Sequence, residues 1–401
     1  MQFRTSSAYR TPPTIGTLVL LSGLSALSMN LFLPSLPNMA LHFDTHYKVM
    51  QLSIALYLLV NAVLQIIIGP IADKAGRRPV LLWGLALFLL ATLGCIYAPT
   101  AEVFLLFRMC QAVVVVGMVL SRAAVRDMYD QDQAASMIGY VTMGMAVVPM
   151  IGPAIGGFLE ESFGWKANFW LPFALGALTL ALTYLDFGET SAKSGKTLLQ
   201  QFREYPELLT SPRFWGYSLS SACSSGAFFA YLGGAPFIGT EVFGMSAAEV
   251  GIYFGAPALG YFLGNFFSGR YSVRFGINRM VLWGTWLNAA GVALSAALFL
   301  TGFGTALSFF GFMTFVGLGN GMTIPNATSG ALSVRPHLAA TASGLSGAIM
   351  LGGGAGLSAL AGALLTVETG AMPLLWLMLI TAILAIAAIS SVIWRERQLG
   401  L

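Results

Sequence analysis

Twelve long apolar runs alternate with short polar stretches along the chain. The runs lie at residues 14–33, 50–70, 80–98, 103–123, 134–158, 167–187, 213–236, 247–268, 279–300, 304–325, 339–363 and 371–394. A helix needs roughly 20 predominantly apolar residues to cross a bilayer, and these runs are of that length. Strands of a membrane β-barrel would alternate apolar and polar residues instead. The pattern therefore predicts an all-α membrane protein with twelve transmembrane helices.

The composition agrees with a chain whose solvent is lipid. It is 57% hydrophobic and 9% charged, whereas soluble domains carry about 25% charged residues. The net charge is +4, but the cations gather in short clusters between the apolar runs. This favours the lipid bilayer, not nucleic acid, as the partner of the basic residues.

The distribution of Lys and Arg predicts the orientation. Of the 20 such residues, 17 fall on the side that carries both termini. Lys48 and Lys166 fall on the other side, and Arg108 lies within the fourth run. Cytoplasmic loops carry an excess of Lys and Arg. We therefore expect both termini in the cytoplasm and an uncleaved first span.

The two halves of the sequence resemble each other at an offset of 200 residues. GPIADKAGRRPVLLWG at 69–84 corresponds to GRYSVRFGINRMVLWG at 269–284. Duplicated units of this kind are typical of transporters, which bind their substrate where the repeats meet. The sequence predicts a six-helix bundle at 1–187, a polar cytoplasmic linker at 188–212 and a second six-helix bundle at 213–401.

The loop at 69–78 carries the first family motif. It fits G-x-x-x-D-[RK]-x-G-R-[RK] through Gly69, Asp73, Lys74, Gly76, Arg77 and Arg78. A tight turn between two helices needs the backbone freedom of a glycine, here Gly76. The second copy has Val273 in place of Asp73. Only the first loop can therefore make an acidic contact.

Three further segments carry family motifs. RMCQAVVVVG at 108–117 has an intramembrane Arg108 and Gln111, and the segment after it contains Arg126 and Asp127. VPMIGPAIGG at 148–157 carries Gly152, Pro153, Gly156 and Gly157. MNLFLPSLP at 29–37 has Pro34 and Pro37, with Asn30 at the position where an acidic residue is usual.

Together these segments resemble the major facilitator superfamily over essentially the full chain. The resemblance is strongest to the bicyclomycin-resistance (Bcr/CflA) branch of twelve-span drug–proton antiporters. It implies a major facilitator fold of two pseudo-symmetric six-helix bundles in the bacterial cytoplasmic (inner) membrane. It further implies efflux of amphipathic drugs or small toxic compounds by alternating access, in exchange for protons and by a monomer. A narrow-specificity carrier for one metabolite stays open as an alternative.

The resemblance also assigns roles to the motif residues. The loop at 69–78, with Arg126 and Asp127, is expected to form a latch between the halves on the cytoplasmic side. Gly152, Pro153, Gly156 and Gly157 are expected to form the helix-packing segment typical of exporters. In the first half, we expect the substrate cavity to be lined by Asn30, Tyr57, Asn61, Gln65, Arg108 and Gln111. In the second half, the expected lining is Phe228, Tyr231, Tyr253, Tyr261, Asn265 and Asn320.

Arg108 has no carboxylate at a similar depth in the sequence, and a charge inside the membrane is costly unless it is paired or wet. We therefore expect Arg108 to face a wet cavity and to bond Asn30 or Gln111. A proton would then have to be carried by a peripheral acid such as Glu102 or by the substrate.

A polytopic membrane enzyme is the remaining alternative. Such an enzyme needs catalytic groups at depth, but His42, His46 and His337 fall in loops and the three cysteines show no C-x-x-C spacing. The sequence predicts no metal and no cofactor.

Overall fold

The computed structural model describes residues 13–128, 148, 151–190, 205–335 and 339–400. Several sequence expectations fall outside these residues, among them the first part of the fifth span and most of the linker. The side chains of Asp73, Arg126 and Asp127 are likewise outside what the structure describes, although all three positions lie in helices.

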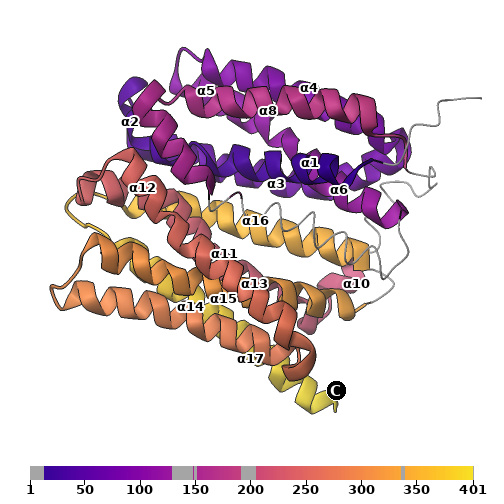
Figure 1. Ribbon diagram of the computed structural model, residues 1–401. Helices are drawn as coiled ribbons and strands as arrows, with labels where there is room; N and C mark the ends of the chain where they lie inside the picture. Colours follow the sequence, from indigo (N-terminus) through magenta and orange to yellow (C-terminus); the bar gives the residue numbers. More distant parts are fainter. Residues whose placement is uncertain (1–12, 129–147, 149–150, 191–204, 336–338, 401) are drawn as a thin grey trace, which may run out of the picture.

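The described chain is helical in both halves (Figure 1). The first half contains α1 (Ile15–Asn30), η1 (Leu33–Ser35), α2 (Leu36–His42), α3 (Tyr47–Ala75), α4 (Arg77–Ile96), α5 (Ala101–Gln111), η2 (Ala112–Val114), α6 (Val115–Met128), a helix at 151–163 and α8 (Ala167–Asp186). The second half contains α10 (Tyr205–Leu209), α11 (Pro212–Phe237), η3 (Ile238–Val242), α12 (Ala247–Tyr253), α13 (Gly255–Phe275), α14 (Ile277–Leu300), α15 (Ala306–Ser333), α16 (Ala339–Leu364) and α17 (Met372–Leu399). The predicted all-α membrane class is confirmed.

Ten of the predicted spans correspond to helical segments that are long and apolar enough to cross a membrane, within the residues described. The seventh run forms α11, which is rich in serine and is not among these ten. This helix packs against α15, α16 and α17. Because its serines are enclosed by protein, its lower hydropathy is compatible with a place inside a membrane protein.

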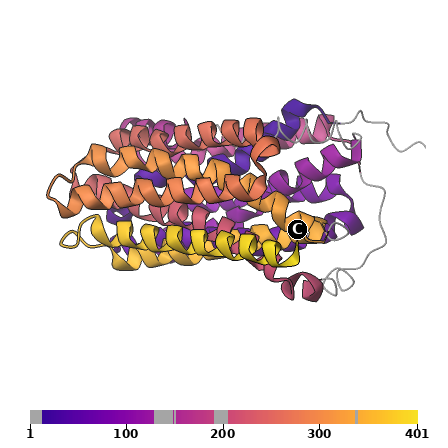
Figure 2. The ribbon, with the colours of Figure 1, turned by 90° about the horizontal axis from the view of Figure 1, so that it is seen from below.

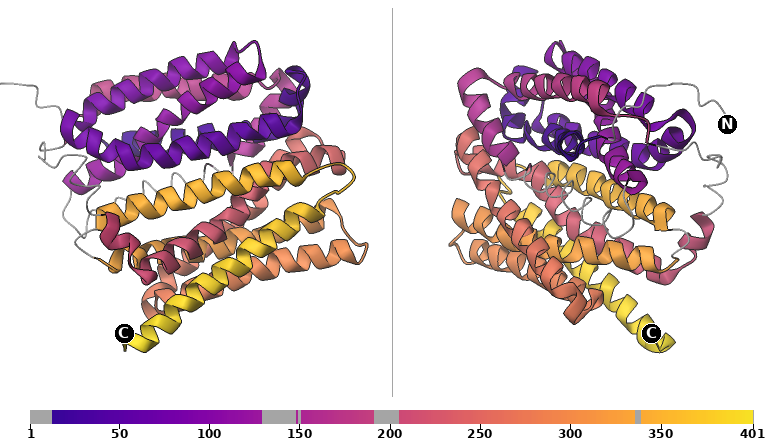
Figure 3. Two further views of the ribbon diagram at one scale, coloured as in Figure 1. Left: turned by 180° about the vertical axis from the view of Figure 1, so that it is seen from behind. Right: turned by 45° about the vertical axis from the view of Figure 1, so that its right-hand side comes forward.

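Two bundles lie side by side (Figure 1). In the first, α1 packs on α6 and α8, and α4 packs on α5 and α8. In the second, α15 packs on α13 and α14, and α11 on α16 and α17. The bundles meet along α3 and α16, which run next to each other in both Figure 1 and the left view of Figure 3. Seen from below, the helices share one general direction, which we take as the membrane normal (Figure 2).

The internal repeat is visible in the backbone. Gly76 separates α3 from α4 with φ +98°, and Gly276 separates α13 from α14 with φ +82°. A side chain with a Cβ rarely adopts such a φ. The repeat offset of 200 residues therefore reflects the same left-handed turn in each half.

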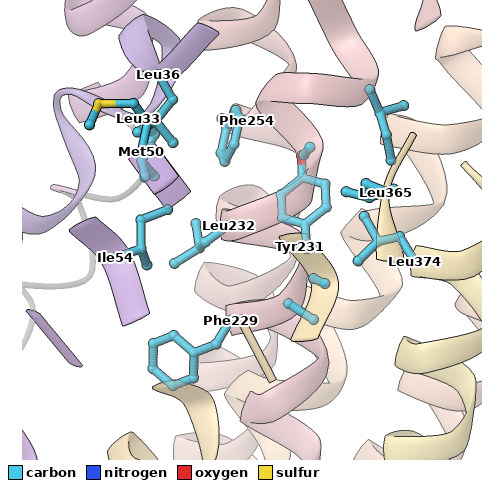
Figure 4. Close-up of a cluster of buried hydrophobic side chains, with 14 of the residues drawn as sticks. Leu33, Leu36, Met50, Ile54, Phe229, Tyr231, Leu232, Phe254, Leu365 and Leu374 are labelled. Carbon is cyan, nitrogen blue, oxygen red and sulfur yellow. The ribbon is translucent and has the colours of Figure 1, made fainter. Parts of the chain in front are cut away.

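The buried apolar residues form one cluster that contains residues of both halves and two clusters that each belong to one half. We call the end of the molecule that carries α2 and α12 the α12 end, and the end that carries α10 the linker end (Figure 1). At the α12 end, one cluster joins both halves: Leu33, Leu36, Met50 and Ile54 lie across from Phe229, Leu232 and Phe254 (Figure 4). At the linker end there are two separate clusters, one made of residues from the first half and one of residues from the second half. Among the described residues, the halves thus share an apolar core at one end only.

Candidate functional site

Arg108 is the center of a polar group enclosed in the first half. It lies near the end of α5 and is 1% exposed. Its guanidinium donates to the Ser28 carbonyl oxygen at 2.9 Å and to the Ser28 Oγ at 3.4 Å. It also donates to the Gln111 Oε1. Gln111 in turn donates from Nε2 to the Thr92 Oγ1 at 2.9 Å. Four helices, α1, α3, α4 and α5, therefore surround one cation.

Two aromatic rings complete this enclosure. The Arg108 Cζ lies 4.3 Å from the Phe32 ring centroid and 4.1 Å from the Tyr57 ring centroid. A planar guanidinium can stack on rings and donate in its plane at the same time, which an ammonium cannot do. Cation–π contacts are worth about 2 kcal/mol or more when they are desolvated. The site thus holds a positive charge, and the partners that the structure describes for it include no carboxylate.

The expected surroundings of Arg108 are partly corrected by this geometry. Of the two predicted partners, Gln111 accepts a hydrogen bond, whereas Asn30 donates to the Ala26 carbonyl oxygen of its own helix at 2.7 Å. The guanidinium is enclosed by protein and does not face an open cavity. Glu102 is exposed in the first turn of α5 and is not a partner of Arg108. The physical reason is that Asn30 is the last residue of α1 and its side-chain amide bonds the Ala26 carbonyl oxygen in the preceding turn, so it is not available to Arg108.

The polar residues predicted in the second half do not form one group. Ser224 on α11 donates to the Asn320 Oδ1 at 2.7 Å, and Asn288 donates to Ser224. Asn265 donates to the carbonyl oxygen of Tyr261 within α13. These bonds satisfy amide groups inside the bundle, where an unpaired polar group would be costly.

Three of the four aromatic residues predicted in the second half, all except Tyr261, gather at the α12 end. Tyr231 is fully buried, with its ring 5.1 Å from Phe254 and 6.2 Å from Phe310 between centroids. Tyr253 also packs on Phe310, at 5.1 Å. They belong to the apolar cluster that joins the halves. Of the other predicted residues, Asn61 is 7% exposed, Gln65 and Tyr261 are partly buried, and Phe228 packs beside Tyr231.

The helix at 151–163 lies between the two halves. A Cβ at Gly156 would overlap the carbonyl oxygen of Leu31, at the end of α1. A Cβ at Gly157 would overlap the carbonyl oxygen of Ala247 on α12, and one at Gly251 would overlap that of Pro153. Small residues let helix backbones approach this closely. A Cβ at Gly152, in contrast, would make an ordinary contact of 3.7 Å with Asn30.

The loop motif is built around the turn at Gly76. Asp73 lies in the last turn of α3, and Arg77 and Arg78 begin α4. The carboxylate of Glu189 accepts hydrogen bonds from the backbone N–H of Arg77 at 2.9 Å and of Arg78 at 3.3 Å. A carboxylate is stabilised at a helix N-terminus by the free N–H groups and the dipole. Sequence reasoning missed Glu189. This residue follows α8 and reaches the turn at Gly76 only because the chain after α8 packs against that turn.

Sequence reasoning also missed contacts that join the halves at the α12 end. The Gln51 Nε2 on α3 donates to the Ser358 carbonyl oxygen at 2.7 Å, and its side chain fills a slot between Gly233 and Gly362. The Tyr47 hydroxyl donates to the Gly233 carbonyl oxygen at 2.9 Å. No local sequence signal identifies such pairs.

Glu161 makes a further contact between the halves, accepting from the backbone N–H of Ala248 at 3.0 Å. Hydrogen bonds from Ser246 and from this N–H hold the pKa of the Glu161 carboxyl below its usual value. This contact therefore stabilises the closed α12 end above the ordinary pKa, and its contribution is lost as pH falls through the lowered value.

A tight contact between α13 and α15 could have been found from the sequence. Gly260 and Gly264 on α13 meet backbone atoms of α15, and Gly317 and Gly321 on α15 meet backbone atoms of α13. Each pair has the small-xxx-small spacing that allows close helix packing. The glycine cluster around 317–321 thus serves the packing of the second bundle.

Comparison with known proteins places this arrangement in a family. The Major Facilitator Superfamily model matches residues 18–357. Multidrug resistance protein D of Escherichia coli (strain K12) is 28% identical, over 89% of this chain and 90% of that protein. The chloramphenicol resistance protein of Pseudomonas aeruginosa is 29% identical over 79% of this chain and 76% of that protein. The bicyclomycin resistance protein homolog of Haemophilus influenzae is 26% identical over 84% of this chain and 86% of that protein.

A solved structure has the same fold. The bacterial homolog of the human lysosomal transporter Spinster, in an inward-facing and occupied conformation, superposes with a TM-score of 0.69. It is 19% identical, over 96% of each chain. The relatives named for drug resistance confirm the resemblance to the Bcr/CflA-like efflux transporters. Because the family model spans most of the chain, the protein belongs to the Major Facilitator Superfamily and is a membrane carrier, not an enzyme.

Proposed function

We propose that the protein exports amphipathic drugs or other small toxic compounds from the cytoplasm in exchange for protons. It works by alternating access as a monomer in the bacterial inner membrane, with both termini cytoplasmic. Relatives named for chloramphenicol, bicyclomycin and multidrug resistance support the substrate class. The excess of Lys and Arg on the side of the termini supports the orientation.

The arrangement of the apolar cores is the observation that carries the mechanism. The halves share one core at the α12 end and have separate cores at the linker end. Two bodies that share an apolar core at one end can rock about a site between them. With the linker end in the cytoplasm, we infer that this conformation is the inward-facing state. The moving bodies are residues 1–187 and 213–401, with 188–212 as the linker.

The buried positive charge of Arg108 is the basis for the substrate preference that we propose. The described partners of this charge include no carboxylate, and charges act over longer distances where the surroundings exclude water. We expect the substrate site, between the halves, to be electrically positive when it is empty. Its lining in this proposal includes Asn61, Tyr253 and Asn265.

A drug panel tests this proposal directly. We expect expression in an efflux-deficient bacterium to raise resistance to several chemically distinct amphipathic compounds, more for neutral, zwitterionic and anionic ones than for cationic ones. Growth inhibition and efflux from inverted vesicles measure this. Resistance to none of them, together with transport of a single metabolite, would identify a narrow-specificity carrier. A marked preference for cations would contradict the role given to Arg108.

The proposed latch at Asp73 is tested by Asp73→Asn. We expect the efflux rate to fall at least about tenfold, about 1.4 kcal/mol in the barrier, while drug binding to the purified protein stays within a few-fold. The reason is that Asp73 lies in the last turn of α3, at the linker end and far from the substrate site. Val273→Asn, at the equivalent position of the second half, is the matched control and should transport normally. Loss of binding together with transport would show that Asp73 shapes the site.

A further inference from the structure

Glu160 is a buried acid that the proposed transport cycle does not yet use. Its side chain lies on the helix at 151–163 and is 7% exposed. The Oε1 accepts a hydrogen bond from the Asn38 Nδ2 of α2 at 2.9 Å. The Oε2 is buried with no hydrogen-bond partner among the described residues. A buried charge with an unsatisfied oxygen costs free energy, and binding a proton removes most of that cost.

No other acidic side chain that the structure describes is buried to this extent. Asp186 accepts hydrogen bonds from Thr14 and Thr17. Glu396 accepts from Arg213, Tyr217 and Asn278. The remaining described acids are exposed.

Glu160 is also placed where the two halves separate. One turn before it, Gly157 is pressed against α12 of the second half. The residue after it, Glu161, accepts from the Ala248 N–H of α12. η1 also contacts α12. Opening of the α12 end would move α12 away from this group of elements, and water would then reach Glu160.

We propose that Glu160 is a proton-binding site coupled to the α12 end, protonated when that end is closed and ionised when it is open. This inference rests on the alternating-access cycle proposed above. A hydronium ion in the water on the outer side gives a proton to the Glu160 Oε2: one O–H bond of the hydronium breaks, which leaves water, and one O–H bond to Oε2 forms. Binding of the proton favours closure, because only the neutral acid is buried at low cost. An exporter needs this step to return from the outward-facing to the inward-facing state.

Few other charged groups lie on the elements that pack against this helix. α1 carries none within its bounds, and the carboxylate of α8, Asp186, is at the linker end. The neighbouring charged groups are His42 and Lys166, which contact the Trp165 ring, Glu161, which caps α12, and Glu249, which is held in a capping box with Ser246.

Protonation of Glu161 should have the opposite effect on the α12 end. Its contact with α12 is lost in acid, which would open the α12 end, whereas protonation of Glu160 would close it. The direction of the response therefore separates the two acids.

The test measures opening and needs no drug. Spin labels at Leu41→Cys on α2 and Glu368→Cys in the loop before α17 report the separation of the halves at the α12 end, since both positions are exposed. The three native cysteines, Cys95, Cys110 and Cys223, are replaced by serine in the labelled protein and in its variants. The labelled protein in lipid vesicles is examined by pulsed electron paramagnetic resonance over about pH 5–8, which lies above the ordinary pKa of a glutamate carboxyl. We expect the closed fraction to rise as pH falls.

Glu160→Gln imitates the neutral acid. It should be predominantly closed at every pH, with its pH response reduced at least about threefold relative to the parent. Glu161→Gln should keep the acid-driven closure, and Glu160→Asp should retain a pH response. An unchanged response in Glu160→Gln, or acid-driven opening of the parent, would overturn the proposal. Because the distances are measured without substrate, a failed drug panel with an intact response would contradict only the proposed export.

Discussion

Arg108→Ala is expected to abolish drug efflux and to lower the thermal stability of the purified protein. The substitution removes the donor of three hydrogen bonds, so the Ser28 carbonyl oxygen, the Ser28 Oγ and the Gln111 Oε1 lose this donor. An orphaned buried acceptor costs about 1–3 kcal/mol. The rings of Phe32 and Tyr57 lose a desolvated cation at 4.3 and 4.1 Å.

Two companion variants separate charge from shape. Arg108→Lys keeps the charge but cannot both stack on two rings and donate in a plane, so we expect most transport to be lost. Lys166→Ala, which removes an exposed cation at the α12 end, is the control and should transport normally. Efflux and the melting temperature in detergent are the measurements. Efflux of neutral and anionic drugs at parental rates by Arg108→Ala would refute the role of Arg108 in transport.

Gly156→Leu is expected to be almost as damaging as the loss of Arg108, with little efflux and a lower melting temperature. Even a single Cβ at Gly156 would overlap the Leu31 carbonyl oxygen, which is backbone and cannot turn aside. The helix at 151–163 cannot simply move away from α1, because Gly157 presses it against α12 on another side. Overpacking of this kind costs typically 1–3 kcal/mol and sometimes more.

Substitution of Gly152, one turn before Gly156 on the same helix, is the control for the substitution of Gly156. The sequence predicts that Gly152 and Gly156 share one close-packed face, but the structure leaves a Cβ at Gly152 in ordinary contact with Asn30 at 3.7 Å. We therefore expect Gly152→Ala to transport nearly normally and Gly156→Ala to be impaired. Gly144, another candidate for comparison, lies outside the described residues. Equal activity in Gly152→Ala and Gly156→Ala would remove the case for a close approach of this helix to α1.

The features that the sequence predicted correctly depend on residues close together in the chain. Hydropathy over one run decides whether that run can lie in lipid, so the spans and the all-α class follow from composition and length. The turns at Gly76 and Gly276 follow from the φ that only glycine adopts readily. Arg108 and Gln111 are one helical turn apart, and this local spacing made Gln111 a predictable partner.

Other features depend on how distant segments pack, and only the tertiary structure decided them. Asn30 could have faced Arg108, but α1 ends so that its amide bonds the preceding turn. Ser28 supplies the Arg108 site with a carbonyl from 80 residues earlier in the chain. Gln51 fits a slot between two glycines of the other half, and Glu160 is buried against α2. Hydropathy and backbone preference are set within a segment, whereas the atoms around a side chain are set by the register and crossing of helices far apart in the sequence.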